Sequence, residues 1–254
     1  MLNKRLIGVV TVINGLAVQS FGYKRYLPLG KPEIVAKNLD RWGVDEILLQ
    51  CIDRSIQNLP PDFALLERVG KTGLSTPVIY AGGILTHADG IKAIKLGADR
   101  ICLDAMLRDS PNVIVELSQS LGAQALIGAL PLNVEDNQLH WYDYRKKNSA
   151  PLCTATLEPI KNKLISEVLL IDWQNEGIVN GFNQQILEKF IFPEVPVIAF
   201  GGLSEASQLQ RVLNRPHVIA AALGNFFNYR ENSVAYFKDQ LLGIPMRMSS
   251  SFLP

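Results

Sequence analysis

The first informative property of this sequence is what it lacks. No stretch approaches the roughly 18 consecutive apolar residues that a membrane-spanning helix needs. The three cysteines, Cys51, Cys102 and Cys153, are odd in number and have no CxxC spacing, which argues against a disulfide framework or a zinc site. The apolar run near the N-terminus is short and has no small-residue cleavage motif, so we interpret it as a strand. We therefore predict a cytoplasmic protein without a metal.

An excess of charge of either sign is also missing. Lysine and arginine number 25 against 24 acidic residues, and the basic residues are spread along the chain, so no nucleic-acid footprint is visible. With 48% hydrophobic residues over a length of 254, the chain can bury one large core. We predict one domain over residues 1–254, in which an anionic ligand would be held by a few local residues.

An internal repeat organises the chain. The segment PVIYAGGI at residues 77–84 is echoed by PVIAFGGL at residues 196–203. Upstream of these, Glu46–Leu49 is matched by Glu167–Leu170 at nearly the same spacing. Several features that recur in one order indicate duplication. The repeat therefore predicts two homologous half-barrels, at about residues 1–123 and 124–254.

The alternation of short β-branched runs with longer amphipathic stretches is typical of βα units. We predict an α/β fold, a single (β/α)₈ TIM barrel. Its strands are expected at residues 5–12, 46–51, 78–80, 100–103, 125–130, 167–171, 197–200 and 218–222. Two connections, Gly15 to Lys31 and Pro131 to Ala150, exceed the usual length of roughly two to six residues. Both follow a strand and so lie on the face that carries barrel active sites. The first is predicted to be a structureless lid, and the second to contain a hairpin at Trp141–Tyr144.

Glycine pairs follow two of the predicted strands. A Gly-Gly turn brings backbone amides close to an anion, and the helix that follows adds a favourable dipole. The alternative is that the glycines only permit the turn. In the first half an acidic residue, Asp104, disfavours a phosphate unless its side chain points away. The predicted phosphate-binding residues are Gly82, Gly83, Asp104 and Ala105 in the first half, and Gly177, Gly201, Gly202, Gly224 and Asn225 in the second.

Residues 4–7, the two glycine pairs, and Glu176 and Gly177 with Gly181 resemble the HisF family, the cyclase subunits of imidazole glycerol phosphate synthase. The resemblance covers nearly the whole chain. It implies a barrel that binds a substrate with a phosphate at each end and receives ammonia through its centre from a glutaminase partner, HisH.

The resemblance also assigns roles to charged residues at the N-terminal mouth of the barrel. The family's ammonia gate is a ring of four charged residues, which matches Arg5, Glu46, Arg100 and Glu167. Asp99 matches an acidic residue at the glutaminase interface. The alternative is that charges at strand starts are ordinary solvated or paired groups.

The family's catalytic residues are not kept. The two aspartates that act as acid and base match Thr11 and Pro131, and neither side chain can transfer a proton as a carboxylate does. A family lysine matches Gln19, an aspartate matches Cys51, and an asparagine matches Asp104. The resemblance thus implies an inherited frame with a rewritten catalytic face.

Three functions fit these observations. The preferred one is a synthase subunit of lyase or amidotransferase type that takes ammonia from a HisH-like glutaminase and amidates a phosphorylated or nucleotide-linked sugar. Paralogues of this kind in the resembling family make acetamidino sugars for surface polysaccharides such as lipopolysaccharide. The second is a genuine cyclase of histidine biosynthesis. The third is a non-catalytic scaffold that activates the glutaminase.

The cyclase alternative needs newly recruited acids and bases. Candidates near strand ends are Asp53, Asp172 and Glu176, although Asp53 beside Arg54 is also compatible with a surface ion pair. The three histidines are not placed to form a catalytic triad, which disfavours covalent acyl chemistry. We predict no cofactor, and no membrane or nucleic-acid partner.

Overall fold

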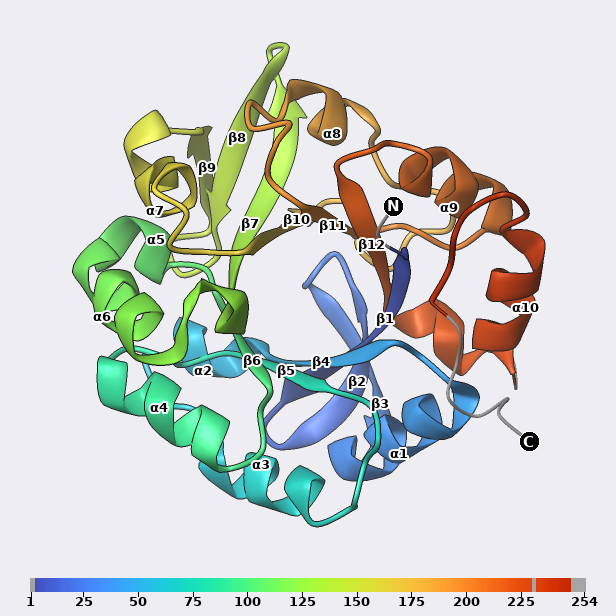
Figure 1. Ribbon diagram of the computed structural model, residues 1–254, viewed down its shortest axis with the longest axis horizontal. Helices are drawn as coiled ribbons and strands as arrows, with labels where there is room; N and C mark the ends of the chain where they lie inside the picture. The colour runs from blue at the N-terminus through green and yellow to red at the C-terminus, as the bar shows by residue number, and fades with distance from the viewer. Residues whose placement is uncertain (1–2, 230–231, 248–254) are drawn as a thin grey trace.

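A closed parallel barrel forms the centre of the computed structural model, which describes residues 3–229 and 232–247 (Figure 1). Each barrel strand pairs with the next, and the last pairs with the first. The predicted (β/α)₈ barrel is confirmed. In order around the barrel the strands are β1 (Arg5–Ile13), β4 (Glu46–Cys51), β5 (Val78–Ala81), β6 (Arg100–Leu103), β7 (Leu126–Glu135), β10 (Glu167–Asp172), β11 (Val197–Phe200) and β12 (Val218–Leu223).

Helices surround the barrel on the outside (Figure 1). Local signals fix where some of them begin: Pro32 stands in the first turn of α1, and Thr86 with Asp89 forms a capping box on α4. No helix among the described residues is long and apolar enough to cross a membrane. The helices are α1 (Pro32–Trp42), α2 (Ile52–Ile56), α3 (Phe63–Gly70), α4 (His87–Lys95), α5 (Met106–Asp109), α6 (Pro111–Leu121), α7 (Glu158–Lys161), α8 (Gln185–Lys189), α9 (Ala206–Leu213) and α10 (Ser233–Gln240).

Successive side chains of each strand point alternately into the barrel and towards the helices. The larger apolar cluster lies between strands and helices, and a smaller cluster fills the lumen. In β1 the lumen receives Ile7 and Val9, so the same alternation directs Arg5 to the N-terminal mouth and Thr11 towards the opposite end. The axis of the barrel is therefore apolar between two polar ends.

The first long connection is not structureless, contrary to the sequence-based prediction. It forms an antiparallel hairpin of β2 (Leu16–Phe21) and β3 (Arg25–Gly30), and β2 also pairs with β1. A two-residue turn separates β1 from β2, and the pairing of β2 with both β1 and β3 satisfies backbone groups of this segment that would otherwise face solvent. Whether the hairpin serves as a lid stays a prediction.

The second long connection contains the predicted hairpin. Strand β7 runs on to Glu135 and pairs with β8 (Gln138–Asp143), which pairs with β9 (Asn148–Pro151). Pro131 therefore lies inside β7 rather than at its end, which corrects the predicted strand boundary. Each half of the barrel thus extends its first strand into an antiparallel hairpin, an arrangement consistent with the predicted duplication.

Candidate active site and the opposite mouth of the barrel

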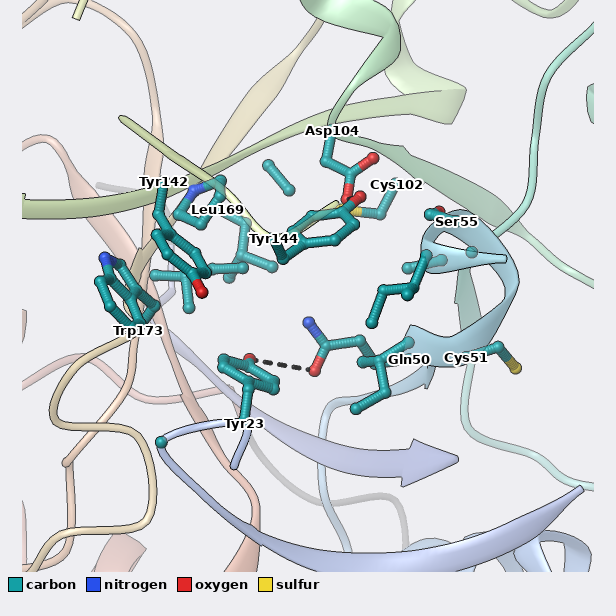
Figure 2. A pocket seen from close by; sticks show the side chains of 18 of the residues that line it. Tyr23, Gln50, Cys51, Ser55, Cys102, Asp104, Tyr142, Tyr144, Leu169 and Trp173 are labelled. Carbon is teal, nitrogen blue, oxygen red and sulfur yellow. Dashed lines mark hydrogen bonds between the residues drawn. The ribbon is translucent and has the colours of Figure 1, made fainter. Parts of the chain in front are cut away.

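A cavity of about 480 Å³ opens at the carboxyl ends of the barrel strands. Aromatic rings from both hairpins line it (Figure 2). Tyr142 stacks on Trp173 with ring centroids 3.7 Å apart, and the Tyr23 hydroxyl donates to Oε1 of Gln50 at 3.2 Å. Lys24 lies 5.7 Å from the Trp173 ring centre. The walls suit a ligand with flat or apolar faces and a few hydrogen-bonding groups.

The two positions that match the family's catalytic aspartates offer no proton-transfer group to this cavity. Pro131 lines it, whereas Thr11 is buried at the position where β1 pairs with both β2 and β4 and does not line the cavity. Among the lining residues in the described part of the chain, Asp104 is the sole carboxylate. Acid–base chemistry at this site would therefore have to use Asp104, tyrosine or lysine side chains.

None of the three carboxylates predicted from strand ends lines the large cavity. Asp53 is buried and accepts the Asn14 amide at 2.8 Å, and it does not pair with Arg54, which contacts Asp62 at 3.1 Å instead. Asp172 accepts from Asn175 and from the Asn183 amide, both at 2.8 Å, and so fixes the turn after β10. Their positions at strand ends were predicted, but hydrogen bonds to neighbouring loops direct their carboxylates away from the cavity.

Glu176 contacts the β2–β3 hairpin and does not line the large cavity, although it borders the small cavity formed by the second-half glycines. Its Oε2 accepts the Ser20 hydroxyl at 2.7 Å, and its backbone carbonyl accepts the Gly22 amide at 2.8 Å. Burial raises the pKa of Glu176, against hydrogen bonds from Ser20, Tyr23 and Gly22 that favour the charged form. This carboxyl therefore joins the turn after β10 to the β2–β3 hairpin.

The predicted second-half phosphate residues come together around one small cavity. Gly177, Gly201, Gly202, Gly224 and Asn225 all line it. The backbones approach so closely that a Cβ atom at Gly177 would lie 2.2 Å from the Ser20 carbonyl oxygen. Asn225 locks the same region, since its amide donates to the Ser20 carbonyl at 2.6 Å. Within the described ranges, the amides of Gly177 and Gly202 meet no protein acceptor, so both are available to an anion.

The first-half phosphate residues are arranged differently. The Gly83 amide donates to the Ser55 hydroxyl at 3.1 Å, and the Ala105 amide donates to Oδ1 of Asp104. Oδ2 of Asp104 accepts the Tyr144 hydroxyl (Figure 2). Desolvation raises the pKa of Asp104, opposed by these donors. Two of the amides predicted to face a phosphate, those of Gly83 and Ala105, already have partners within the protein.

An ion-pair cluster holds the β8–β9 turn that carries Tyr144. Asp143 is buried and accepts from Arg108 at 2.7 Å and from Arg145 at 3.3 Å. Arg145 also contacts Asp109 at 2.6 Å. Since Arg108 and Asp109 belong to α5, the cluster fastens the turn to the segment that follows Asp104. Tyr144 is thereby held over the cavity.

Replacing Asp143 with asparagine is expected to lower the free energy of unfolding by about 1–3 kcal/mol at neutral pH, because charge-assisted hydrogen bonds are lost. Burial would raise the pKa of Asp143, but hydrogen bonds from Arg145 and the charge of Arg108 outweigh it and lower that pKa. A lowered folded pKa stabilises the protein above the unfolded value of about 4, and this contribution is lost as pH falls through the folded pKa. Urea unfolding of both proteins at about pH 7 and pH 3 measures the difference, which should shrink at the lower pH. A difference that stays constant with pH would contradict the prediction.

The N-terminal mouth of the barrel is closed by the four charged residues that the sequence singled out. Arg5 contacts Glu46 at 2.9 Å and Glu167 at 2.7 Å, while Arg100 contacts Glu167 at 3.0 Å and Glu46 at 3.6 Å. Burial raises the pKa of Glu46, against the attraction of both arginines. The structure thus brings all four predicted residues into one ring, which argues against independent solvated charges.

The barrel axis between this ring and the large cavity is apolar. A small void of about 10 Å³ on the barrel axis is lined by Ile7, Leu48 and other lumen residues. Cys102 and Leu169 line both this void and the large cavity. Asp99 is exposed at the start of β6, on the same face as the ring, and its carboxylate accepts the Val78 amide at 2.8 Å.

Several cavity residues were not predicted from the sequence, among them Tyr23, Gln50, Tyr142 and Tyr144. One signal could have identified the last two: both belong to the aromatic run at residues 141–144, in a long connection after a strand and so on the face that carries barrel active sites. Gln50 directly precedes Cys51, the residue that matches a family aspartate, and it lines the cavity. The resemblance therefore pointed to the neighbouring position. Cys51 also borders the cavity, and burial raises its pKa to about 12, so it is no thiolate at neutral pH.

The histidine biosynthesis protein family matches residues 5–233 of this chain. The chain belongs to this family. Subunit hisF2 of imidazole glycerol phosphate synthase from Vibrio vulnificus, a name given provisionally, is 27% identical over 254 residues, which cover 98% of this chain and 93% of that protein. The HisF subunit of Exiguobacterium sp. is 26% identical over 255 residues, covering 99% of each chain. HisF of Thermotoga sp. is 25% identical and covers 95% of each. The HisF resemblance is therefore confirmed at the level of the family.

Proposed function

We propose that this chain is the synthase subunit of a HisF-like complex in which a HisH-like glutaminase docks at the N-terminal mouth and supplies ammonia. Ammonia passes the ring of Arg5, Glu46, Arg100 and Glu167 and reaches the large cavity along the apolar axis. There it serves a reaction other than imidazole ring closure. The acceptor we favour is a sugar carried on a phosphate or nucleotide, converted to an acetamidino sugar.

The observation that carries this proposal is the contrast between the two ends of the barrel. The ring keeps all four charges in mutual contact, whereas threonine and proline stand where the family's acid and base stand. Burying four paired charges without using them would be costly, since desolvation of an ion pair often offsets its attraction. Retention of the ring therefore supports a role for the mouth, and loss of the carboxylates supports a different reaction.

The exposed Asp99 beside the ring is the residue we assign to the glutaminase interface. For the acceptor, the glycine turns after β10 and β11 offer free amides to one phosphate, and the stacked Tyr142 and Trp173 offer a flat wall to a ring. This combination suits a sugar phosphate or a sugar nucleotide.

The test uses the purified full chain with a HisH-like glutaminase. We expect glutamine hydrolysis to be stimulated on mixing, and we expect no turnover of the bisphosphate precursor of imidazole glycerol phosphate when ammonium salt replaces glutamine. Stimulation without precursor turnover supports the proposal. Failure to stimulate any such glutaminase overturns it.

A genuine cyclase is the second candidate. It is favoured by the names of the relatives, which are imidazole glycerol phosphate synthase subunits that match this chain over nearly their whole lengths. Asp104 is the carboxylate that would then act in the cavity. Turnover of the bisphosphate precursor in the same assay establishes this function and excludes ours. The third candidate, a scaffold, predicts stimulation of the glutaminase with no phosphate binding, and equilibrium dialysis with radiolabelled phosphate would reveal it.

A further inference from the structure

The two glycine turns of this barrel have become chemically unequal. In the second half, the Gly177 and Gly202 amides have no protein acceptor among the described residues. In the first half, the Gly83 amide, which corresponds to that of Gly202, donates to the Ser55 hydroxyl, and the Ala105 amide donates to the Asp104 carboxylate. A protein oxygen therefore accepts from each of these two amides, where a phosphate oxygen would otherwise accept.

The Asp104 carboxylate is not free to turn aside. Its two oxygens accept from different donors, Oδ1 from the Ala105 amide and Oδ2 from the Tyr144 hydroxyl. The Ser55 hydroxyl forms a further hydrogen bond with Tyr144. Ser55, Tyr144 and Asp104 thus form one network that joins the occupied amides, and Figure 2 shows these side chains on one side of the cavity.

The turn that carries Tyr144 is itself anchored. Asp143, the residue before it, contacts Arg108 of α5 at 2.7 Å, close along the chain to Asp104. The α5 segment, which follows Asp104, therefore also holds the turn that carries Tyr144, the donor to Asp104. A carboxylate held in this way repels a second anion, because two like charges in a desolvated site interact strongly.

We propose that Asp104, held by Tyr144, closes the first-half anion site, so that the ligand of this cavity carries phosphate at one end only. That phosphate lies at the glycine turns of the second half, and the end of the ligand near Asp104 carries no negative charge. The inference rests on the proposed function in one respect, the phosphate site of the second half. It makes Asp104 a residue that determines specificity, by excluding substrates with a phosphate at each end.

The experiment measures the stoichiometry of inorganic phosphate binding to the full chain alone, by equilibrium dialysis with radiolabelled phosphate at about pH 8, well above the ordinary pKa of a carboxyl group. We expect one phosphate per wild-type chain. Asp104→Asn removes the charge and Asp104→Ala also frees the Ala105 amide, so both should bind a second phosphate at least about tenfold more tightly than the wild type does. A wild-type chain that binds two phosphates overturns the inference.

Two control variants test whether the charge of Asp104 itself excludes the second phosphate. One frees an occupied amide without removing that charge, and the other removes a negative charge elsewhere on the surface. Ser55→Ala frees the Gly83 amide but leaves the carboxylate, so it should still bind one phosphate. Asp136→Asn makes the same chemical change as Asp104→Asn at the exposed β7–β8 turn, and it should also bind one. Failure of both Asp104 variants to bind a second phosphate, while remaining folded by circular dichroism, contradicts the inference. A wild-type chain that binds none refutes the second-half phosphate site instead, and the glutaminase test stands independently of all these outcomes.

Discussion

Replacing Arg5 with alanine is expected to lower the free energy of unfolding by about 2–4 kcal/mol, because removal of one partner leaves buried charges uncompensated. Arg5 contacts both carboxylates of the ring. Glu46 is 5% exposed, and its Oε2 already lacks a partner among the described residues. Loss of Arg5 leaves Arg100, at 3.6 Å, as the remaining contact of Glu46 within the ring. Urea unfolding monitored by circular dichroism measures the change.

The pH dependence of this variant follows from Glu46. Burial raises the pKa of Glu46 in the wild type, and without Arg5 that pKa rises further. A folded carboxyl with a raised pKa binds its proton more tightly than the unfolded chain does. The stability linked to it is present below the unfolded value of about 4 and is lost as pH rises through the folded pKa. The Arg5→Ala protein should therefore lose stability more steeply than the wild type as pH rises above the unfolded value of about 4.

Two further variants make the result specific. Arg41→Ala removes an exposed arginine from the last turn of α1 and should cost less than about 0.5 kcal/mol. Adding Glu46→Gln to Arg5→Ala removes the orphaned charge and should flatten the pH dependence. Equal losses in the Arg5 and Arg41 variants would show that the ring does not act as a buried network.

Replacing Gly201 with alanine is expected to destabilise the protein by more than about 4 kcal/mol, the range reached only by severe steric or burial defects. Gly201 has φ +105°, and a Cβ atom there would lie 2.3 Å from the Asp172 carbonyl oxygen. Asp172 ends β10 and Gly201 directly follows β11, so the two backbones cannot separate without opening the turn. The yield of folded protein and its denaturation midpoint provide the measurement.

The repeat supplies a matched variant in the other half. Gly82 has φ +126°, and a Cβ atom there would lie 2.2 Å from the Cys51 carbonyl oxygen, so Gly82→Ala should cost as much. Gly73 isolates the cost of conformation alone, since φ is +67° but nothing lies within 4 Å of its Cβ position. Gly73→Ala should lose only about 1–2 kcal/mol. If Gly201→Ala loses no more than this, close approach of the backbones does not explain the glycine.

The sequence located most of the barrel because the relevant signals are local and periodic. Runs such as Glu46–Cys51 and Val197–Phe200 were placed at the observed boundaries, since an inner strand of a barrel is apolar on both faces and ends at a turn. For β7 the sequence predicts an end just before Pro131, because proline is usually confined to edge strands and strand ends. The observed strand continues to Glu135. Its continuation depends on pairing with β8, a partner that no local signal in β7 specifies.

The sequence by itself determined the frame: the doubled glycine turns, the eight strands and the charges at their starts. These follow from the backbone conformation that a residue permits and from strand periodicity, which are properties of short segments. Only the tertiary structure decided which polar groups are already satisfied. Tyr144 meets Asp104 across 40 residues of sequence, and the Asp53 and Glu176 carboxylates are taken up by the segment that follows β1. A hydrogen bond between distant segments depends on how the hairpins fold over the barrel, and so the unequal character of the two glycine turns became visible only in three dimensions.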